Sequence, residues 1–206
     1  MAAPKIRDAL PADVDGLARL ESSSFDTDRL APRSFRRLIA APTAACRVAV
    51  SGDALAGYYV LLFRAGSNAA RLYSVAVDPG HRGGGLAKAL LADAEVTARA
   101  CGARRMRLEV RRDNDVAIRL YERRGYRPIA RRAGYYADGG DALVCEKNLD
   151  PGSDERGKIA EEDRSPRDSL VRSAYIEAAT GANSVAPRVA SISVRSLAET
   201  AAPPPR

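Results

Sequence analysis

The sequence predicts an α/β (α+β) domain in which helices cover both faces of one mixed sheet. Along residues 1–149 the apolar residues recur first with the spacing of strands and then alternately with the spacing of strands and helices, which is typical of such a sheet. The composition changes after that point, because residues 150–206 contain six of the twelve prolines, eight serines and a single aromatic residue. We therefore predict a domain over 1–149, followed by a mostly disordered C-terminal extension over 150–206.

The first half of the domain is predicted to contain a short strand, two helices and three longer strands. Phe35, Leu38 and Ile39 recur at helical spacing, whereas two apolar runs flank the turn Ser51-Gly52-Asp53 as in a hairpin. The predicted elements are Lys5 to Asp8 (strand), a helix from about Asp13, Pro32 to Ala40 (helix), and the strands Ala45 to Val50, Leu55 to Phe63 and Leu72 to Val77.

The second half is predicted to alternate helices and strands. Met106, Leu108 and Val110 share one face of a strand, and the charged residues between them share the other. The predicted elements are a helix from about Gly85 to Ala100, a strand from Arg105 to Val110, a helix that Asn114 caps and that ends at Gly125, and strands at about 126–132 and 142–148.

One stretch of the extension, at about 166–180, has the pattern of a helix. Ser165-Pro166 resembles a helix start, and an apolar stripe from Leu170 to Ala179 ends before Gly181. The pattern is equally consistent with a helix that docks on the domain or on a partner and with a transient, undocked helix.

Few residues in the chain are suited to bind a metal or to act in a nucleophilic triad. The chain has one histidine, His81, and three cysteines, Cys46, Cys101 and Cys145, without a Cys-x-x-Cys pair. We therefore expect no metal and no Ser-His-Asp triad. The start of the chain lacks the apolar segment of a secretory signal, and the longest apolar run, Leu55 to Phe63, is far shorter than the ~20 residues of a membrane helix. These features predict a cytoplasmic protein that does not enter a membrane.

A strand end, a run of glycines and the start of a long helix follow one another between Val77 and Lys88. Glycine allows a tight turn and close approach of the backbone to a ligand, and the amides at a helix start attract phosphate. Because Arg82 and Lys88 add positive charge, the stretch predicts a pyrophosphate site. Leu86 stands where a P-loop requires lysine, and Lys88 where the dinucleotide pattern requires its third glycine. The alternative is a glycine-rich turn that binds nothing.

The same stretch resembles the acyl-CoA loop of the GNAT N-acetyltransferase superfamily, whose motif Q/R-x-x-G-x-G/A is met by Arg82, Gly85 and Ala87. The resemblance implies the GNAT acyl-CoA N-acyltransferase fold, with a mixed, mostly antiparallel sheet, and acetyl-CoA as co-substrate. It also implies that the loop binds the CoA pyrophosphate and that the preceding strand pairs with the pantetheine arm. The residues implied are Val75, Ala76 and Val77 beside the arm, and Arg82, Gly83, Gly84, Gly85, Leu86, Ala87 and Lys88 at the pyrophosphate.

Motifs in the second half resemble the ribosomal-protein-alanine N-acetyltransferase (RimI-like) branch of this superfamily. They are LEVRRDN over 108–114, AIRLYERRGY over 117–126, and a Tyr135-Tyr136 pair before the last predicted strand. The resemblance implies that Glu109 takes a proton from the acceptor amine, directly or through a water, and that Tyr121 gives one to the departing sulfur. It also implies that Asn114 contacts CoA. The tyrosine pair either shapes the acceptor slot or covers the core.

The chemistry of amine acetylation is consistent with these roles. A protein α-amine has an ordinary pKa of about 7.7–8.0, against about 10.4 for lysine, so an N-terminus loses its proton more easily near neutral pH. A carboxylate can take that proton, and a tyrosine hydroxyl can supply one to sulfur. Structural roles are the alternatives: Glu109 in a surface ion pair with Arg107 and Arg111, Tyr121 in the core, and Asn114 as a helix cap only.

The leading hypothesis is an enzyme that acetylates the N-terminal amine of a protein, with a ribosomal protein bearing an N-terminal alanine as one candidate. The acceptor side, Phe25 to Phe35, follows the family loosely and lacks its tryptophan, so a small amine or a lysine side chain is the alternative acceptor. A basic nucleic-acid-binding protein is the alternative of another class, because the chain has 33 Lys and Arg residues but only 26 Asp and Glu residues. Direct nucleic-acid binding is not expected, since the chain has few aromatic residues and no recognised motif.

Overall fold

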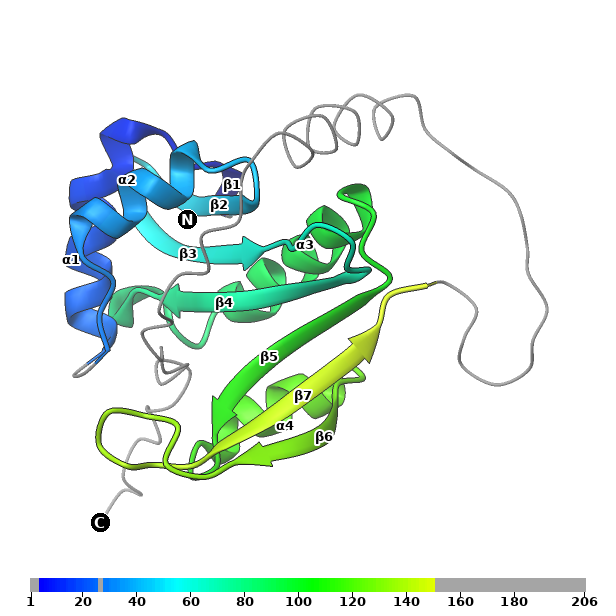
Figure 1. The fold of residues 1–206 in the computed structure, drawn as a ribbon. Coiled ribbons are helices and arrows are strands. Elements are labelled where there is room, and N and C mark those ends of the chain that lie inside the picture. Colours follow the sequence, from blue (N-terminus) through cyan, green and yellow to red (C-terminus); the bar gives the residue numbers. More distant parts are fainter. Residues whose placement is uncertain (1–3, 26–27, 151–206) are drawn as a thin grey trace, which may run out of the picture.

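The computed structural model of the chain describes residues 4–25 and 28–150 (Figure 1). The predicted extension and its helix at about 166–180 lie outside the described residues, so the domain boundary at residue 149 stays a prediction. Within the described part, the predicted strands and helices all occur, in the predicted order and with bounds shifted by a few residues.

Seven strands form one sheet, and four α-helices pack on it within the described residues. The elements are β1 (Lys5–Asp8), α1 (Val14–Ser24), α2 (Pro32–Ala40), β2 (Ala44–Ser51), β3 (Ala54–Leu62), β4 (Ala69–Val77), α3 (Leu86–Ala100), β5 (Arg105–Arg111), α4 (Asp115–Arg123), β6 (Arg127–Arg132) and β7 (Ala142–Asn148). The strand order in the sheet is β1-β2-β3-β4-β5-β7-β6. The predicted hairpin is confirmed as the antiparallel pair of β2 and β3.

The sheet is mostly antiparallel, as predicted, and it opens between its two central strands. Among the described strands, β4 and β5 form the one parallel pair, which runs from Ala69 opposite Arg105 to Leu72 opposite Leu108. Beyond this short ladder the two strands diverge toward their C-terminal ends, as Figure 1 shows. β4 begins three residues earlier than predicted, at Ala69, because its pairing with β5 starts before the apolar run that begins at Leu72.

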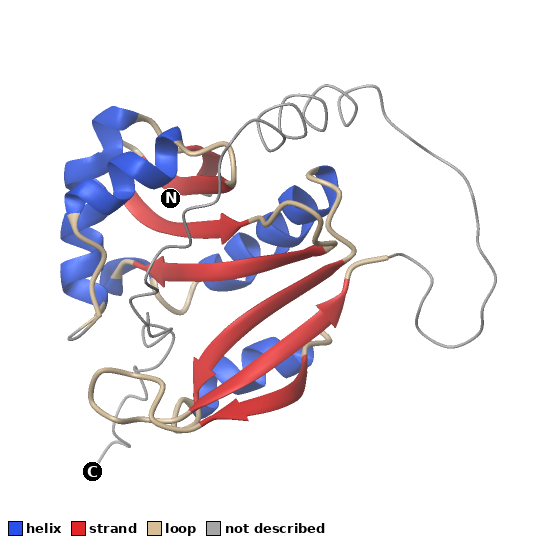
Figure 2. Cartoon of the chain, viewed as in Figure 1, coloured by secondary structure: helices blue, strands red, loops and turns tan. Residues whose placement is uncertain are grey.

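Helices cover both faces of the sheet, as predicted (Figure 2). On one face, α3 and α4 pack over a core cluster whose members from the central strands include Leu72, Met106 and Leu108. On the other face, α1 and α2 cover a second cluster around Phe35 and Tyr58, whose rings meet edge to face at 5.5 Å. The opening between the C-terminal halves of β4 and β5 therefore lies between the two layers of helices.

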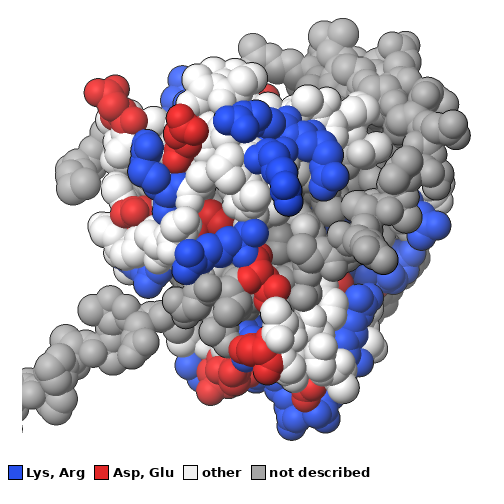
Figure 3. Space-filling model, turned by 60° about the vertical axis from the view of Figure 1, so that its left-hand side comes forward, with Lys and Arg blue, Asp and Glu red and all other residues white. Residues whose placement is uncertain are grey.

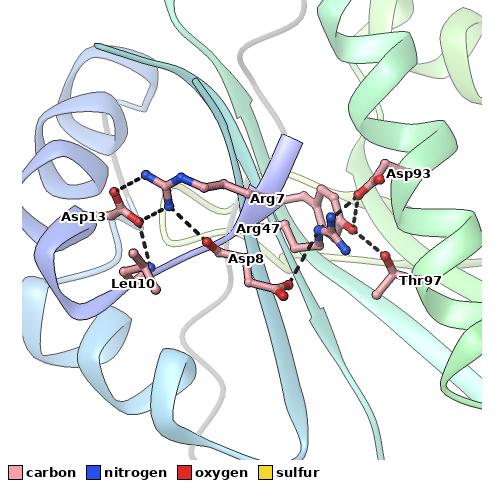
Figure 4. Close-up of polar contacts among 8 residues, drawn as sticks. Arg7, Asp8, Leu10, Asp13, Arg47, Asp93 and Thr97 are labelled. Carbon is pink, nitrogen blue, oxygen red and sulfur yellow. Dashed lines mark hydrogen bonds and ion pairs between the residues drawn. The ribbon is translucent and has the colours of Figure 1, made fainter. Parts of the chain in front are cut away.

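Polar contacts fix the first and third helices to the sheet (Figure 4). Arg7 of β1 forms two hydrogen bonds, of 2.6 and 2.8 Å, with Asp13 at the start of α1. On α3, Asp93 accepts a hydrogen bond of 2.7 Å from the Tyr59 hydroxyl and lies 3.3 Å from Arg47. Because two strands hold this one side chain, α3 has a defined position on the sheet, and so has the loop that precedes it.

Candidate active site

The loop between β4 and α3 is an exposed turn with a defined backbone. The Asp78 carboxylate accepts a hydrogen bond of 2.9 Å from the Gly80 amide and lies 3.1 Å from Nδ1 of His81. Gly83 and Gly85 adopt φ values of 78° and 80°, which glycine reaches without a steric penalty. The chain then enters α3 directly, so the turn presents its backbone at a helix N-terminus.

The geometry of this loop fits a phosphate group. The amides of Gly83 and Gly84 donate no hydrogen bond to any group within residues 4–25 and 28–150, and the first-turn amides of an α-helix have no intrahelical partner. A Cβ atom at Gly83 or Gly85 would have nothing within 4 Å, so no side chain blocks the turn. Lys88 is exposed nearby, whereas the Leu86 side chain is buried in the core and offers only its amide.

The C-terminal half of β4 has a strand partner on one side only. Val75, Ala76 and Val77 pair with β3, and their side chains are buried in the two cores. On the side toward β5, no strand of the described part pairs with β4 beyond Leu72. This edge fits an extended ligand that would hydrogen-bond to the backbone, which is how the pantetheine arm is expected to bind.

Glu109 lies one residue beyond the last β4–β5 pair, and its side chain is 8 % exposed. Its Oε2 atom accepts a hydrogen bond of 2.9 Å from Nε of Arg71, and its Oε1 atom lies 3.9 Å from Nη2 of Arg132. The alternative of a surface ion pair with Arg107 and Arg111 is therefore wrong, since the carboxylate is buried and its partners come from other strands. Oε1 accepts no hydrogen bond from the residues that the structure describes.

The two arginines that flank Glu109 in the sequence have partners elsewhere. Arg107 lies directly opposite Glu146 on β7 and is hydrogen-bonded to it. Arg111 is buried, donates a hydrogen bond of 2.8 Å to Asp138, and its guanidinium lies 4.8 Å from the centre of the Tyr136 ring. Arg111 thus holds the loop between β6 and β7 against the end of β5.

Tyr121 combines a core position with an unsatisfied hydroxyl. The ring is buried, with Tyr126 edge to face at a centroid distance of 5.7 Å. The hydroxyl has no hydrogen-bond partner among the described residues. A buried hydroxyl without a partner lowers the stability of the fold unless a ligand supplies the hydrogen bond. Burial raises the pKa of Tyr121 well above its usual value, so the phenol keeps its proton at neutral pH. This orphaned donor fits a bound group that needs a proton.

Asn114 caps α4, as predicted: its Oδ1 atom accepts a hydrogen bond of 3.0 Å from the Ala117 amide. A contact with CoA stays a prediction for this residue. The two tyrosines of the pair have different surroundings, and the choice between an acceptor slot and the core stays a prediction. The Tyr135 hydroxyl accepts a hydrogen bond of 2.7 Å from Arg71 and therefore lies beside the Glu109 carboxylate, whereas Tyr136 is buried.

The sequence did not indicate Glu21, a buried carboxylate on the apolar face of α1. It accepts a hydrogen bond of 2.8 Å from the Leu30 amide and another from the Tyr58 hydroxyl, which in turn lies 2.7 Å from the Ser74 hydroxyl. The available signal was an acidic residue within an otherwise apolar stripe. The same holds for Arg71, a charged residue inside an apolar strand.

Metal ligands do not gather in the part of the chain that the structure describes. No group of three or more His, Cys, Asp or Glu side chains there could hold a metal ion. Nor does any described helix have the length and apolar character needed to cross a membrane.

Comparison with known protein families agrees with this geometry. The sequence pattern of the acetyltransferase (GNAT) family matches residues 14–126, more than half of the chain, and the chain belongs to this family. The predicted fold and the predicted enzyme class, an N-acetyltransferase, are therefore confirmed. Enzymes with this fold use acetyl-CoA, and the turn before α3 has a geometry that fits its phosphate groups.

Three relatives indicate to which branch of the family the chain is similar. The chain is 31 % identical over 143 residues to a Bacillus subtilis (strain 168) protein provisionally named a ribosomal protein bS18-alanine N-acetyltransferase, with 68 % of this chain and 91 % of that protein covered. It is 33 % identical over 141 residues to N-alpha-acetyltransferase RimI of Mycobacterium tuberculosis, with 66 % and 87 % covered. It is 37 % identical over 142 residues to uncharacterized protein ML0378 of Mycobacterium leprae, but this match spans 66 % of the chain and only 38 % of that longer protein. The resemblance to the RimI-like branch is thus confirmed.

Solved structures share the fold. The Escherichia coli ribosomal-protein-S18-alanine N-acetyltransferase superposes with a TM-score of 0.65 at 23 % identity, covering 75 % of this chain and 99 % of that chain. The PaiA N-acetyltransferase of Thermoplasma acidophilum, solved in complex with coenzyme A, superposes with a TM-score of 0.61 at 20 % identity, covering 71 % and 99 %. At these identities the likeness establishes the fold alone.

Proposed function

We propose that this acetyltransferase transfers the acetyl group of acetyl-CoA to the N-terminal α-amine of a protein, with a ribosomal protein bearing an N-terminal alanine as the leading acceptor. One observation carries the proposal: Glu109, whose Oε1 atom accepts no hydrogen bond from the described residues, lies where β4 and β5 diverge, and α4 supplies the Tyr121 hydroxyl, which has no partner among those residues either. The names of the Bacillus subtilis and Mycobacterium tuberculosis relatives support the choice of acceptor. A ribosomal acceptor would be met in the cytoplasm.

The turn before α3 would hold the pyrophosphate of acetyl-CoA. Backbone amides from Gly83 to Lys88 would donate hydrogen bonds to it, and Arg82 and Lys88 would add positive charge. The C-terminal half of β4, Val75 to Val77, would hydrogen-bond to the pantetheine arm. The arm would then lead from the turn toward Glu109, along the divergence of the two strands.

Two proton transfers accompany the reaction. Acetyl-CoA supplies a thioester, and the acceptor nitrogen forms the new C–N bond as the C–S bond breaks. The ammonium form of the acceptor first loses one proton to solvent. Glu109 then takes the proton that the attacking amine loses, at Oε1 or through a water, and the Tyr121 hydroxyl gives its proton to the departing sulfur. Solvent then removes the proton from Glu109 and restores the one on Tyr121, so the products are the amide and free CoA thiol.

A comparison of two peptides tests this function. The full chain is incubated with acetyl-CoA and a lysine-containing peptide that has an N-terminal alanine, either free or chemically blocked. We expect thiol release with the free peptide and, by mass spectrometry, one acetyl group on its α-amine. Acetylation of the blocked peptide alone would overturn the proposal in favour of a lysine acetyltransferase.

Acetyl-CoA binding distinguishes the proposed enzyme from a nucleic-acid-binding protein, which is the alternative of another class. On the face in Figure 3, one group of lysine and arginine side chains lies near the top and a row of them follows the lower right margin, with acidic side chains between the two. Nucleic-acid-binding surfaces usually present a basic stripe. We expect acetyl-CoA to raise the melting temperature of the protein; tight RNA binding without such a shift would contradict the enzymatic function.

A further inference from the structure

A cluster of arginine and tyrosine side chains surrounds Glu109 on the sheet face that α1 and α2 share. We call it the acceptor-side cluster; its members are Glu109, Arg71, Tyr73, Arg132 and Tyr135. Arg71 joins three of them, because it donates hydrogen bonds of 2.9 Å to Glu109 and 2.7 Å to Tyr135, and its guanidinium lies 5.5 Å from the Tyr73 ring centre. Arg132 lies 5.5 Å from the Tyr135 ring centre.

The acceptor-side cluster carries an excess of positive charge. It holds two guanidinium groups and one carboxylate. Burial raises the pKa of Tyr73 and of Tyr135, so both phenols are neutral at neutral pH. Arg37 of α2 and Glu21 of α1 are both close enough to act on Tyr73, so they add one further positive and one further acidic group and leave the excess in place. An acceptor that arrives with an ammonium group would add to this excess.

Asp28, an acidic residue outside the cluster, does not remove the excess. Asp28, in the segment between α1 and α2, accepts a hydrogen bond of 3.3 Å from the Ala137 amide in the loop after β6. That contact joins the two segments beside the acceptor-side cluster, but it uses the Asp28 carboxylate for a backbone amide. No ion pair between Asp28 and Arg71, Arg37 or Arg132 forms among the described residues.

Arg132 is the member of the cluster that can bind a further group. Its side chain is 54 % exposed, and its one acidic neighbour within the described residues lies at 3.9 Å, beyond hydrogen-bond distance. Arg71, by contrast, is 27 % exposed and already donates two hydrogen bonds. An exposed guanidinium is suited to bind a carboxylate through two parallel hydrogen bonds.

We propose that the preferred acceptor carries an aspartate or glutamate at its second or third residue, and that Arg132 binds this carboxylate. The proposal rests on the proposed function, in which the acceptor α-amine reaches Oε1 of Glu109. Successive residues of an extended chain advance by about 3.3–3.6 Å, so a side chain one or two residues after the amine lies within reach of a guanidinium 3.9 Å from that oxygen. The carboxylate would offset the charge that the ammonium brings.

Matched peptides test the proposal on the full chain. Three peptides with an N-terminal alanine differ only at the second residue, which is aspartate, asparagine or lysine. We expect kcat/KM for the aspartate peptide to exceed that for the asparagine peptide about three- to tenfold, mainly through KM, and the lysine peptide to be the poorest. Raising the salt concentration should reduce the difference, because an exposed ion pair is screened.

Two variants locate the effect. Arg132→Gln should remove the preference for aspartate over asparagine. Arg127→Gln, at the other end of the same exposed strand, should keep it, because no described residue forms an ion pair with Arg127. Equal rates for the three peptides, or a preference for lysine, would overturn the inference while the proposed function stands. If Arg132→Gln raised KM for acetyl-CoA instead of the peptide, the assigned ligand would be wrong; acetylation of no peptide would overturn the proposed function as well.

Discussion

The amide of Leu30 donates a hydrogen bond of 2.8 Å to the carboxylate of Glu21, which is buried beneath the segment that joins α1 to α2. The same carboxylate accepts a hydrogen bond from Tyr58, whose hydroxyl lies 2.7 Å from that of Ser74 on β4. One acidic group therefore connects a segment beside the acceptor-side cluster to the strand next to the expected pantetheine site. A change in its protonation state should therefore change the stability of the domain.

The first prediction concerns stability and pH. Burial raises the pKa of Glu21 from 4.5 to about 7, so the folded state binds a proton more tightly than the unfolded state between these values. The stability that this proton binding contributes is fully present below about pH 4.5 and is lost as the pH rises to about 7. We expect Glu21→Gln to abolish this decline, measured as the free energy of unfolding in urea from pH 4.5 to pH 8.

An exposed glutamate and a second acid provide the checks on that result. Glu122→Gln, on the surface of α4, should keep the decline. Arg7 lowers the pKa of Asp13 below 3.8, so the stability that Asp13 contributes is lost only at lower pH and does not overlap with the Glu21 window. If Glu21→Gln retained the decline, Glu21 would not be its source.

Glu109→Gln should lower kcat by about 10²–10⁴-fold, because the amide keeps the shape of the side chain but cannot take a proton from the amine. The affinity for acetyl-CoA, measured by calorimetry, should change little. Glu146→Gln is the matched control, since Glu146 pairs with Arg107 on the neighbouring strand and has no proposed part in the reaction. Full activity of Glu109→Gln would remove Glu109 from the reaction.

Tyr121→Phe should reduce kcat by about 10²-fold without lowering the free energy of unfolding, because the lost hydroxyl has no hydrogen-bond partner among the described residues. Tyr59→Phe should show the opposite pattern. Its hydroxyl contacts Asp93 at 2.7 Å and Thr97 at 2.8 Å, so we expect a loss of about 1 kcal/mol in stability with activity retained. Kinetics and urea unfolding on both variants would separate the roles, and a destabilised but active Tyr121→Phe would indicate a core residue only.

Gly83→Ala should weaken acetyl-CoA binding. Gly83 has φ 78°, and Gly66, in the turn between β3 and β4, has φ 74°; a Cβ atom meets nothing within 4 Å at either position. Alanine should therefore cost each site a similar amount of backbone strain, about 1–2 kcal/mol. Only Gly83→Ala should also raise the Kd for acetyl-CoA, and equal Kd values for the two variants would argue against the turn as the pyrophosphate site.

Local signals explain why the elements of the fold could be predicted. Asn114 does cap α4, and Gly85 does precede α3, because capping depends on residues a few positions apart. The alternation of Met106, Leu108 and Val110 likewise identified the face of β5 that packs into the hydrophobic core under α3 and α4. Such features are decided within one turn or one strand, so the sequence contains them directly.

The surroundings of Glu109 could not be predicted in the same way. Residues 104–132 contain eleven arginines, and nothing in their spacing distinguishes Arg132 from the others. The partner Arg71 comes from 38 positions earlier, through the register of β4 on β5 and the reach of a long side chain. The unpartnered hydroxyl of Tyr121 depends on how α4 packs, which is also set by tertiary contacts.

The strand β6 forms one margin of the sheet, and each of its six residues is exposed. Such a margin is a place where a strand from another polypeptide can add and begin aggregation. Pro128 has no amide hydrogen to offer an incoming strand, and Arg127, Arg131 and Arg132 would repel a second copy of the same margin. The arginine that we assign to substrate binding would thus also help to keep the protein dispersed at high concentration.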